Sequence, residues 1–326
     1  MSLDSDVIVD RRRIRRKLTF WRVVAALVAI AAIVTVGVIV TPGGRGAFTA
    51  SGSIARIQID GLIRSDNDRV EALERLEKSR AAAVIVHINS PGGTTAGSEQ
   101  LYDALVRLKA KKPVVVVVEG LAASGGYITA IAADHIIAQQ SSLVGSIGVL
   151  FQFPNFTELL KTVGVKVEEV KSSPLKAAPN GFEPTSPEAR AALDALVKDS
   201  YAWFRDLVKA RRGMDDALLE QVADGRVFTG RQAVDLKLID QLGDEKTAIA
   251  WLVAQKNVKS DLPVRDFKLS PRFGDLTFLR TAASITLDAL GLGAIARQVE
   301  QGGVAQAVDR LGLDGMLALW SPAGPN

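Results

Sequence analysis

The sequence predicts an α/β protein built on a parallel β-sheet with crossover helices. Two segments, Ala83–Ile88 (AVIVHI) and Val114–Val118 (VVVVV), are almost wholly apolar, as is typical of parallel strands covered on both faces. Residues with helical spacing, 95–110, lie between them. This strand, helix, strand order indicates a right-handed crossover, and it places functional residues at the carboxyl ends of the strands.

Periodicity and capping residues predict the other elements of the folded part. Ser186 and Pro187 are an N-cap and a first helical residue for a long helix that ends near Gly213, and Thr229 begins a second capped helix. The remaining expectations are strands at 54–63 and 135–139, helices at 68–79 and 127–133, a buried turn or bulge at 141–151, and a strand from Lys166 that leads into a Pro-rich loop.

The composition limits the possible functions. A chain of 326 residues, 48% of them hydrophobic, can bury a large core, and the absence of cysteine excludes disulfides and thiolate metal sites. Residues 1–22 hold seven basic and three acidic residues, which accounts for the whole net charge of +4. The rest of the chain is neutral, so nucleic-acid binding is not expected. The two histidines, His87 and His135, are expected to be structural, and neither a metal nor a cofactor is predicted.

The N-terminal region has the pattern of a membrane anchor. Residues 1–22 are a basic tail, and residues 23–40 are eighteen consecutive residues without a charge, long enough to span a bilayer core of about 30 Å. The basic flank predicts an N-terminus in the cytoplasm, a transmembrane helix at 23–40, and a catalytic domain outside the cytoplasmic membrane. A cleaved signal peptide with small residues at 47–50 is the competing interpretation, and a buried soluble helix is a third.

Residues 41–53 are rich in Gly, Ser and Thr and are predicted to be a linker, followed by a folded domain at 54–257. The stretch 258–326 is an extension whose pattern is weak. Its apolar residues are too many for a free tail, so we expect it to lie against the membrane or a neighbouring subunit. These residues are Leu276, Phe278, Ile285, Leu287, Leu290 and Leu292.

Chemistry is predicted where the strand at 114–118 ends. The segment EGLAASGGY, residues 119–127, places Ser124 in a turn of small residues, and a second Gly-Gly turn, NSPGG, follows the neighbouring strand at 89–93. A serine hydroxyl needs a base, and a neutral lysine can serve, while the amides of a Gly-Gly turn can stabilise an oxyanion. Lys171 and Lys176 lie in a later loop. The alternative is a tight turn with an incidental serine.

Five segments, and the order in which they occur along the chain, resemble the signal peptide peptidase A family. This family is a group of membrane-anchored Ser-Lys proteases with a Clp-protease/crotonase-like fold. The resemblance covers about residues 54–257. The segments are NSPGG at 89–93, LAASGGY at 121–127, GSIGV at 145–149, PLKAAPNGFEPTSPEA from Pro174, and GRVFTGRQAVDLKLID at 225–240. The chain departs from the family where Ala177 and Ala178 follow the lysine, since members often carry a polar residue there.

The resemblance implies a role for each residue of a catalytic site. Ser124 would be the nucleophile, Lys176 the general base and Ser146 a hydroxyl that orients the lysine. Gly92 or Gly93 would form the oxyanion hole together with the amide of Gly125. For Lys176 to act as a base near neutral pH, its surroundings should be apolar, because burial disfavours the charged form.

The resemblance also implies substrates and partners. The substrates would be cleaved signal peptides and other short apolar peptides, and the protein would form a homo-oligomeric ring. Two other classes of function are possible for this fold. One is a non-catalytic membrane scaffold, and the other is a crotonase-like acyl-CoA enzyme.

Overall fold

The computed structural model describes Trp21, residues 52–269 and residues 317–319. The chain divides into two compact units, Met1–Gly52 and Ser53–Asn326, and the elements below belong to the second. The transmembrane prediction for 23–40 lies outside the described residues, as does the prediction for the apolar residues of 276–292. None of the helices in the described ranges is long and apolar enough to cross a membrane.

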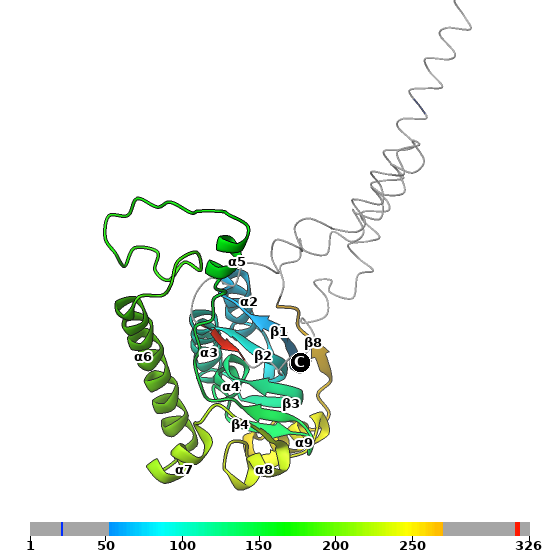
Figure 1. The fold of residues 1–326 in the computed structure, drawn as a ribbon. Helices are drawn as coiled ribbons and strands as arrows, with labels where there is room; N and C mark the ends of the chain where they lie inside the picture. Colours follow the sequence, from blue (N-terminus) through cyan, green and yellow to red (C-terminus); the bar gives the residue numbers. More distant parts are fainter. Residues whose placement is uncertain (1–20, 22–51, 270–316, 320–326) are drawn as a thin grey trace, which may run out of the picture. The chain divides into compact units, whose positions relative to one another are not determined.

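In the described part of the chain, the strands form one nine-stranded mixed sheet (Figure 1). The strand order is β6-β5-β3-β2-β1-β8, with β4 paired to β3, β7 to β4, and β9 to β2. The central pairings are parallel, as predicted, whereas β6 and β9 pair antiparallel to their neighbours. The strands are β1 Ser53–Ile63, β2 Ala81–Thr94, β3 Val114–Ala123, β4 His135–Ala138, β5 Leu143–Gly145, β6 Val227–Thr229, β7 Gln241–Leu242, β8 Val264–Asp266 and β9 Leu317–Leu319.

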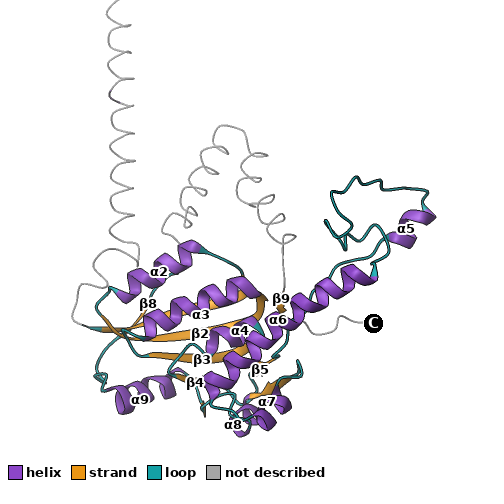
Figure 2. Ribbon diagram, turned by 90° about the vertical axis from the view of Figure 1, so that its left-hand side faces the viewer, coloured by secondary structure: helices purple, strands orange, loops and turns teal. Residues whose placement is uncertain are grey.

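Helices cover both faces of this sheet (Figure 2). The larger core lies under α2, α3, α4 and α6, and a smaller core lies under α9 on the opposite face. Both faces of β2 and β3 are therefore buried, which explains their unbroken apolar sequences. The helices are α2 Asn67–Glu77, α3 Thr95–Lys109, α4 Gly125–Ala130, α5 Thr157–Thr162, α6 Pro187–Arg212, α7 Asp216–Val222, α8 Gly230–Asp235 and α9 Glu245–Lys256.

Local capping explains where the predicted helices begin. The Ser186 side chain accepts a hydrogen bond from the amide of Ala189 at the start of α6, which ends at a left-handed Gly213. Thr229 and Gln232 form a capping box at the start of α8. Both predictions are confirmed. β2 and β3 are longer than predicted, because each strand continues through the glycine-rich segment that follows its apolar run.

The strand predicted from Lys166 does not form. Residues 166–171 are irregular, and the side chain of Val170 is fully exposed. The sequence has the β-branched residues of a strand, but no other strand of the described chain pairs with this segment. A strand without a partner leaves its backbone hydrogen bonds to water and gains little stability.

The segment 151–186 stands away from the sheet because of α6 (Figures 1 and 2). This helix has 26 residues and is about 39 Å long at ~1.5 Å per residue. Ser200, Phe204 and Val208, in its C-terminal half, are buried, whereas most of the N-terminal half is exposed. The helix is thus anchored at one end, and the other end carries the loop outward.

A polar network ties the central strands to α9. His87 on β2 lies between two carboxylates, with Nδ1 2.8 Å from Glu119 Oε1 and Nε2 2.7 Å from Glu245 Oε2. Arg56 on β1 donates two hydrogen bonds of 2.7 Å to the same Glu245 carboxylate. His87 is therefore a satisfied core residue, as predicted. His135 is also structural, because its ring stacks on Trp251 with centroids 4.6 Å apart.

We expect Glu245→Gln to destabilise the protein more near pH 7 than in acid. Hydrogen bonding to Arg56 lowers the pKa of Glu245 below its usual value, against the opposing effect of burial, with a smaller contribution from His87. Stability from a depressed carboxyl pKa is fully present above the unfolded value and is lost as pH falls through the folded value. Urea unfolding should show a loss of about 1–3 kcal/mol at pH 7 and a smaller difference near pH 3.

The control for this prediction is Glu71→Gln. Glu71 makes an exposed ion pair with Arg75 at 3.9 Å, and such pairs contribute about 0.3–0.5 kcal/mol. Equal losses in the two variants, or a Glu245→Gln difference that does not change with pH, would contradict the assignment.

Candidate active site

Ser124 lies at the sharp turn between β3 and α4. Its backbone has φ 55° and ψ −116°, a conformation that is strained for a residue with a side chain and that is common at functional turns. The turn is held by hydrogen bonds: the Ser124 amide donates to Gly145 O at 2.8 Å, and its carbonyl accepts from the amides of Tyr127 and Ile128 at 2.9 Å. Ser124 is 1% exposed, and its buried hydroxyl has no hydrogen-bond partner within the described residues.

Ser146 directly follows β5, as Ser124 directly follows β3. Ala123 and Gly145 are the last residues of these two strands and pair with each other, and adjacent strands lie about 4.8 Å apart, so Ser124 and Ser146 begin at neighbouring strand ends. Ser146 is buried and also has a positive φ, 52°, and its amide donates to Arg226 O at 2.8 Å. The fold therefore brings these two predicted site residues together.

The glycines predicted for the oxyanion hole lie at the end of β2. A Cβ on Gly93 would fall 1.8 Å from the carbonyl oxygen of Ile63, so only glycine fits between β1 and β2 here. The Gly92 amide donates to Ser90 Oγ at 3.1 Å. Because that donor is already used, the amides of Gly93 and Gly125 are the better candidates for binding an oxyanion.

Helix α4, which begins after Ser124, is fixed at several points. A Cβ on Gly126 would fall 2.7 Å from Ser90 O, so this glycine lets α4 lie directly against the end of β2. The fully buried Tyr127 donates from its hydroxyl to Leu238 O at 2.7 Å. Burial raises the pKa of this phenol, so it remains a donor.

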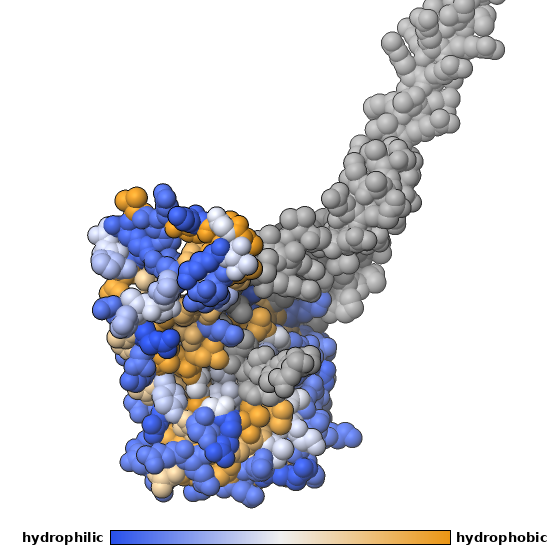
Figure 3. All heavy atoms as spheres, viewed as in Figure 1, coloured by the Kyte–Doolittle hydropathy of each residue, from blue (hydrophilic) through white to orange (hydrophobic). Residues whose placement is uncertain are grey.

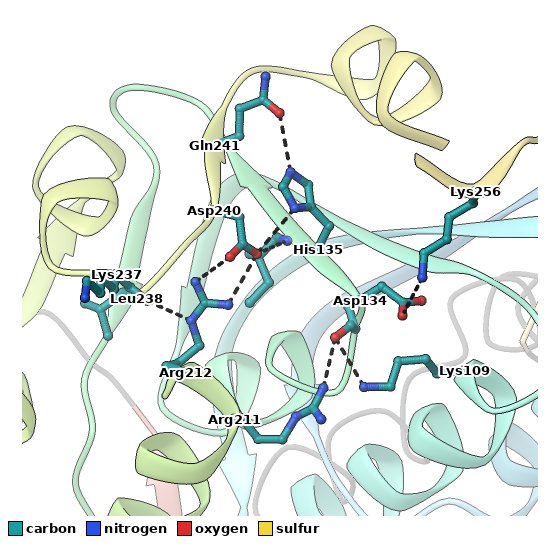
Figure 4. Close-up of polar contacts among 12 residues, drawn as sticks. Lys109, Asp134, His135, Arg211, Arg212, Lys237, Leu238, Asp240, Gln241 and Lys256 are labelled. Atoms are coloured by element: carbon teal, nitrogen blue, oxygen red, sulfur yellow. Dashed lines mark hydrogen bonds and ion pairs between the residues drawn. The ribbon is translucent and has the colours of Figure 1, made fainter. Parts of the chain in front are cut away.

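Arg211, in the last turn of α6, binds the carbonyl groups just beyond α4. Its Nε donates to Ile131 O at 2.8 Å, and its Nη2 donates to Ala132 O and Ala133 O at 3.3 and 3.0 Å. Figure 4 shows Arg211 and Lys109 converging on this segment, while the adjacent Arg212 binds Asp240. Sequence reasoning missed Arg211, because one basic residue in a helix's last turn does not reveal which distant carbonyls it contacts.

The two candidate lysines lie in the loop that α6 carries outward. Lys176 is exposed, so the apolar surroundings expected for a base are not present around it in the single chain. Lys171 makes ion pairs with Glu169 at 2.6 Å and Glu183 at 2.5 Å. Hydrogen bonding to Glu169, and next to Glu183, raises the pKa of Lys171, which is opposite to what a general base requires.

The chain matches two peptidase families. It matches Peptidase family S49 over residues 106–259 and Clp protease over residues 57–142. It is 37% identical over 210 residues to "Putative protease slr0021" of Synechocystis sp., covering 64% of this chain and 76% of that protein. The chain belongs to peptidase family S49. This membership and the mixed α/β sheet, with its Clp-protease-like fold, agree with the resemblance found in the sequence.

Two further relatives match over smaller shares of their length. "Putative signal peptide peptidase SppA" of Enterococcus faecium is 31% identical over 198 residues, covering 60% of this chain and 57% of that protein. "Protease 4" of Haemophilus influenzae is 30% identical over 217 residues, covering 65% of this chain but only 35% of that protein. The chain therefore spans about a third of the length of the Haemophilus protein.

We expect Arg211→Met to destabilise α4 and to lower peptidase activity. The substitution leaves three carbonyls without their guanidinium donor, which should cost about 1–3 kcal/mol in urea unfolding. Activity measured well below the unfolding midpoint should also fall, because α4 fixes the carbonyl of Ser124. Arg205→Met is the control on the same helix, since Arg205 lies over the Tyr201 ring at 5.6 Å. Similar losses in both variants would contradict a specific role for Arg211.

Proposed function

We propose that this S49 peptidase is a serine endopeptidase in which Ser124 is the nucleophile and Lys176 the general base. The observation that carries the proposal is the Ser124 hydroxyl, which is buried, held on a strained turn and without a partner among the described residues. A buried hydroxyl normally has a hydrogen-bond partner. The missing partner is explained if a base approaches Ser124 when the site is complete.

The proposed chemistry follows from the groups around that hydroxyl. A neutral lysine amine takes the Ser124 proton as Oγ attacks a peptide carbonyl, and the new oxyanion is stabilised by the amides of Gly93 and Gly125. The lysine then protonates the leaving amine, and water hydrolyses the acyl-enzyme. Ser146 lies on the neighbouring strand end, where its hydroxyl can orient the amine without adding a charge.

We further propose that Lys176 reaches the Ser124 of a neighbouring copy in a homo-oligomer. The buried C-terminal half of α6 holds the loop away from its own sheet. Apolar residues are interspersed with polar ones at this end of the molecule (Figure 3). Several large apolar side chains of the loop and of the outer end of α6 are exposed in the single chain. If they packed against a second copy, their burial would stabilise the assembly and would give Lys176 apolar surroundings. They are Phe151, Phe156, Leu159, Val163, Val165, Val167, Val170, Leu175, Phe182 and Leu196.

For substrates and location, we propose cleaved signal peptides and other short apolar peptides at the outer face of the cytoplasmic membrane. The name of the Enterococcus relative supports the substrate class. Small residues around Ser124 and an apolar core beside it suit an extended apolar peptide. The anchor predicted at 23–40 would hold the peptidase where such peptides remain after secretion.

Ser124→Ala should abolish peptide hydrolysis, with a loss of at least ~10³-fold in kcat, because no other nucleophile lies on this turn. The measurement is cleavage of a mixture of synthetic signal peptides, followed by mass spectrometry. The control is Ser79→Ala, whose hydroxyl donates to Leu76 O at the end of α2. Undiminished cleavage by Ser124→Ala would exclude the serine mechanism.

Lys176→Met should lower kcat by about 10²–10⁴-fold, whereas Lys171→Met should have a mild effect. Lys171 is the matched control, because it lies in the same loop and is held by two carboxylates. The reverse order of the two effects would mean that Lys171 is the base.

A mixture of the inactive Ser124→Ala and Lys176→Met proteins distinguishes where the lysine comes from. If it comes from a neighbouring copy, mixed assemblies contain sites with both residues, and part of the activity returns. If each chain supplies its own lysine, the mixture remains inactive.

A further inference from the structure

Arg64 is the first residue after β1, at the edge of the sheet where the candidate active site lies. Ile63, the last residue of β1, pairs with Gly93, a proposed oxyanion donor. A Cβ on Gly97 would fall 2.5 Å from the carbonyl carbon of Arg64, so the backbone of Arg64 lies directly against the first turn of α3. Arg64 is therefore fixed close to the strand end that presents Gly93.

The guanidinium of Arg64 lacks the partner that its neighbours have. Arg64 is half-buried, and its Nε is buried with no hydrogen-bond partner within the described residues. By contrast, Arg56 donates to Glu245 at 2.7 Å, and Arg69 forms an ion pair with Asp66 at 3.6 Å. A guanidinium is charged, and a buried charged donor without an acceptor is costly. The unused donor indicates an anionic ligand.

Arg64 lines an open hollow at the start of α2. The hollow has a volume of about 490 Å³, and Leu62 and Arg69 also line it. Small-molecule sites commonly have volumes of about 300–1,000 Å³, so the hollow is large enough for the end of a peptide. Leu62 is 39% exposed and provides an apolar wall beside the guanidinium. This combination suits an apolar peptide segment that carries a carboxylate.

Hydrogen bonds to α3 hold the hollow in shape. The Asp66 amide donates to Gln100 Oε1 at 2.8 Å, and Gln100 Nε2 donates to Asn67 Oδ1 at 3.0 Å. Asp66 is also the N-cap of α2 and accepts from the Arg69 amide at 3.0 Å. The two helices lie side by side over the larger core (Figures 1 and 2). A site that is already formed does not have to be ordered by its ligand, which favours binding.

The separation of Arg64 from the nucleophile matches a short length of extended peptide. Ser124 follows β3 and Arg64 follows β1, and β2 lies between these two strands. Two strand spacings of ~4.8 Å amount to about 10 Å, and an extended chain advances ~3.3 Å per residue. A group bound at Arg64 therefore lies about three residues from a bond that Ser124 attacks.

We propose that Arg64 binds a carboxylate of the peptide substrate, about three residues from the scissile bond. This inference rests on the proposed function and adds a substrate preference to it. The carboxylate belongs either to the free C-terminus of the peptide or to an acidic side chain. A cleaved signal peptide has the first kind, because hydrolysis leaves a carboxylate at its cut end. Hydrogen bonds between charged groups of this kind are stronger than those between neutral groups.

The test compares peptide binding by Arg64→Met and by a control, Arg75→Met, in the full-length chain. All the chains carry Ser124→Ala, so that binding does not depend on catalysis. Arg75 lies in the last turn of α2 and makes an exposed ion pair with Glu71. It therefore matches Arg64 in residue type but is not among the residues that line the hollow.

The probes are three peptides of alternating leucine and alanine, labelled with fluorescein at the N-terminus and followed by anisotropy. One ends in a free carboxylate, one in an amide, and one in an amide with glutamate as its last residue. With Arg64 present, a carboxylate peptide should bind about five- to twentyfold more tightly than the plain amide. Arg64→Met should remove this preference, and Arg75→Met should keep it.

The three probes also identify the source of the carboxylate. A preference for the free C-terminus alone assigns the terminal carboxylate, and a preference for the glutamate peptide alone assigns an acidic side chain. The urea unfolding midpoint of Arg64→Met should not fall, because the substitution removes a charge that has no partner at its Nε in the described chain. A clear fall would show that Arg64 has a structural partner, and it would overturn the proposal.

Two further results would contradict the carboxylate site. One is equal Kd values for the three peptides, or a preference that survives Arg64→Met. The other is a change in assembly size on size-exclusion chromatography of Arg64→Met with no change in peptide preference, which would assign the anion to a neighbouring copy. With Ser124 restored, kcat/KM should show the same carboxylate preference. If those chains cleave no peptide while the binding preference persists, the proposed function fails and the carboxylate site stands.

Discussion

The close approach of β2, α4 and β5 around one serine is the constraint on which the rest of the site depends. Gly93 lets β2 lie against the backbone of β1, and Gly126 lets α4 lie against Ser90. With these contacts, the turn at Ser124 is forced into a positive φ and held by the hydrogen bond to Gly145. A larger residue at either glycine would move the end of β2 away from its neighbours around Ser124, because the backbone atoms that it would meet cannot move aside as a side chain can.

The part of the candidate site that lies at the strand ends, around Gly92, Gly93 and Ser124, could be predicted from the sequence because its signals are local. The apolar runs before residues 89 and 119 identify buried parallel strands, and such strands end at the same edge of a sheet. That rule alone places the glycines at 92 and 93 near Ser124. The proximity of Ser146 needed more information, since β5 is only three residues long and its neighbour depends on the tertiary fold.

The structure of the loop that carries Lys176, and the role of Arg211, could not be predicted from local signals. Both depend on residues far away in the sequence. The β-branched residues after Lys166 indicate a strand, yet Val170 is exposed and none of the described strands pairs with it. The role of Arg211 likewise depends on α6 packing against α4, about eighty residues earlier in the sequence. The position of Lys176 is set by the length of α6, which separates an anchored end from an exposed loop. In each case the sequence specifies the residue, while its function is decided by what packs against it.

The departure of β3 from β2 explains why β2 has a free edge beyond Ser90, the edge on which β9 pairs. An active site at the carboxyl ends of parallel strands requires β3 to leave the sheet and form the turn at Ser124, and its departure exposes main-chain groups on the edge of β2. An unpaired edge binds any extended segment that reaches it. The pairing of β9 with Gly92 and Gly93 thus follows from the departure of β3 toward the turn at Ser124.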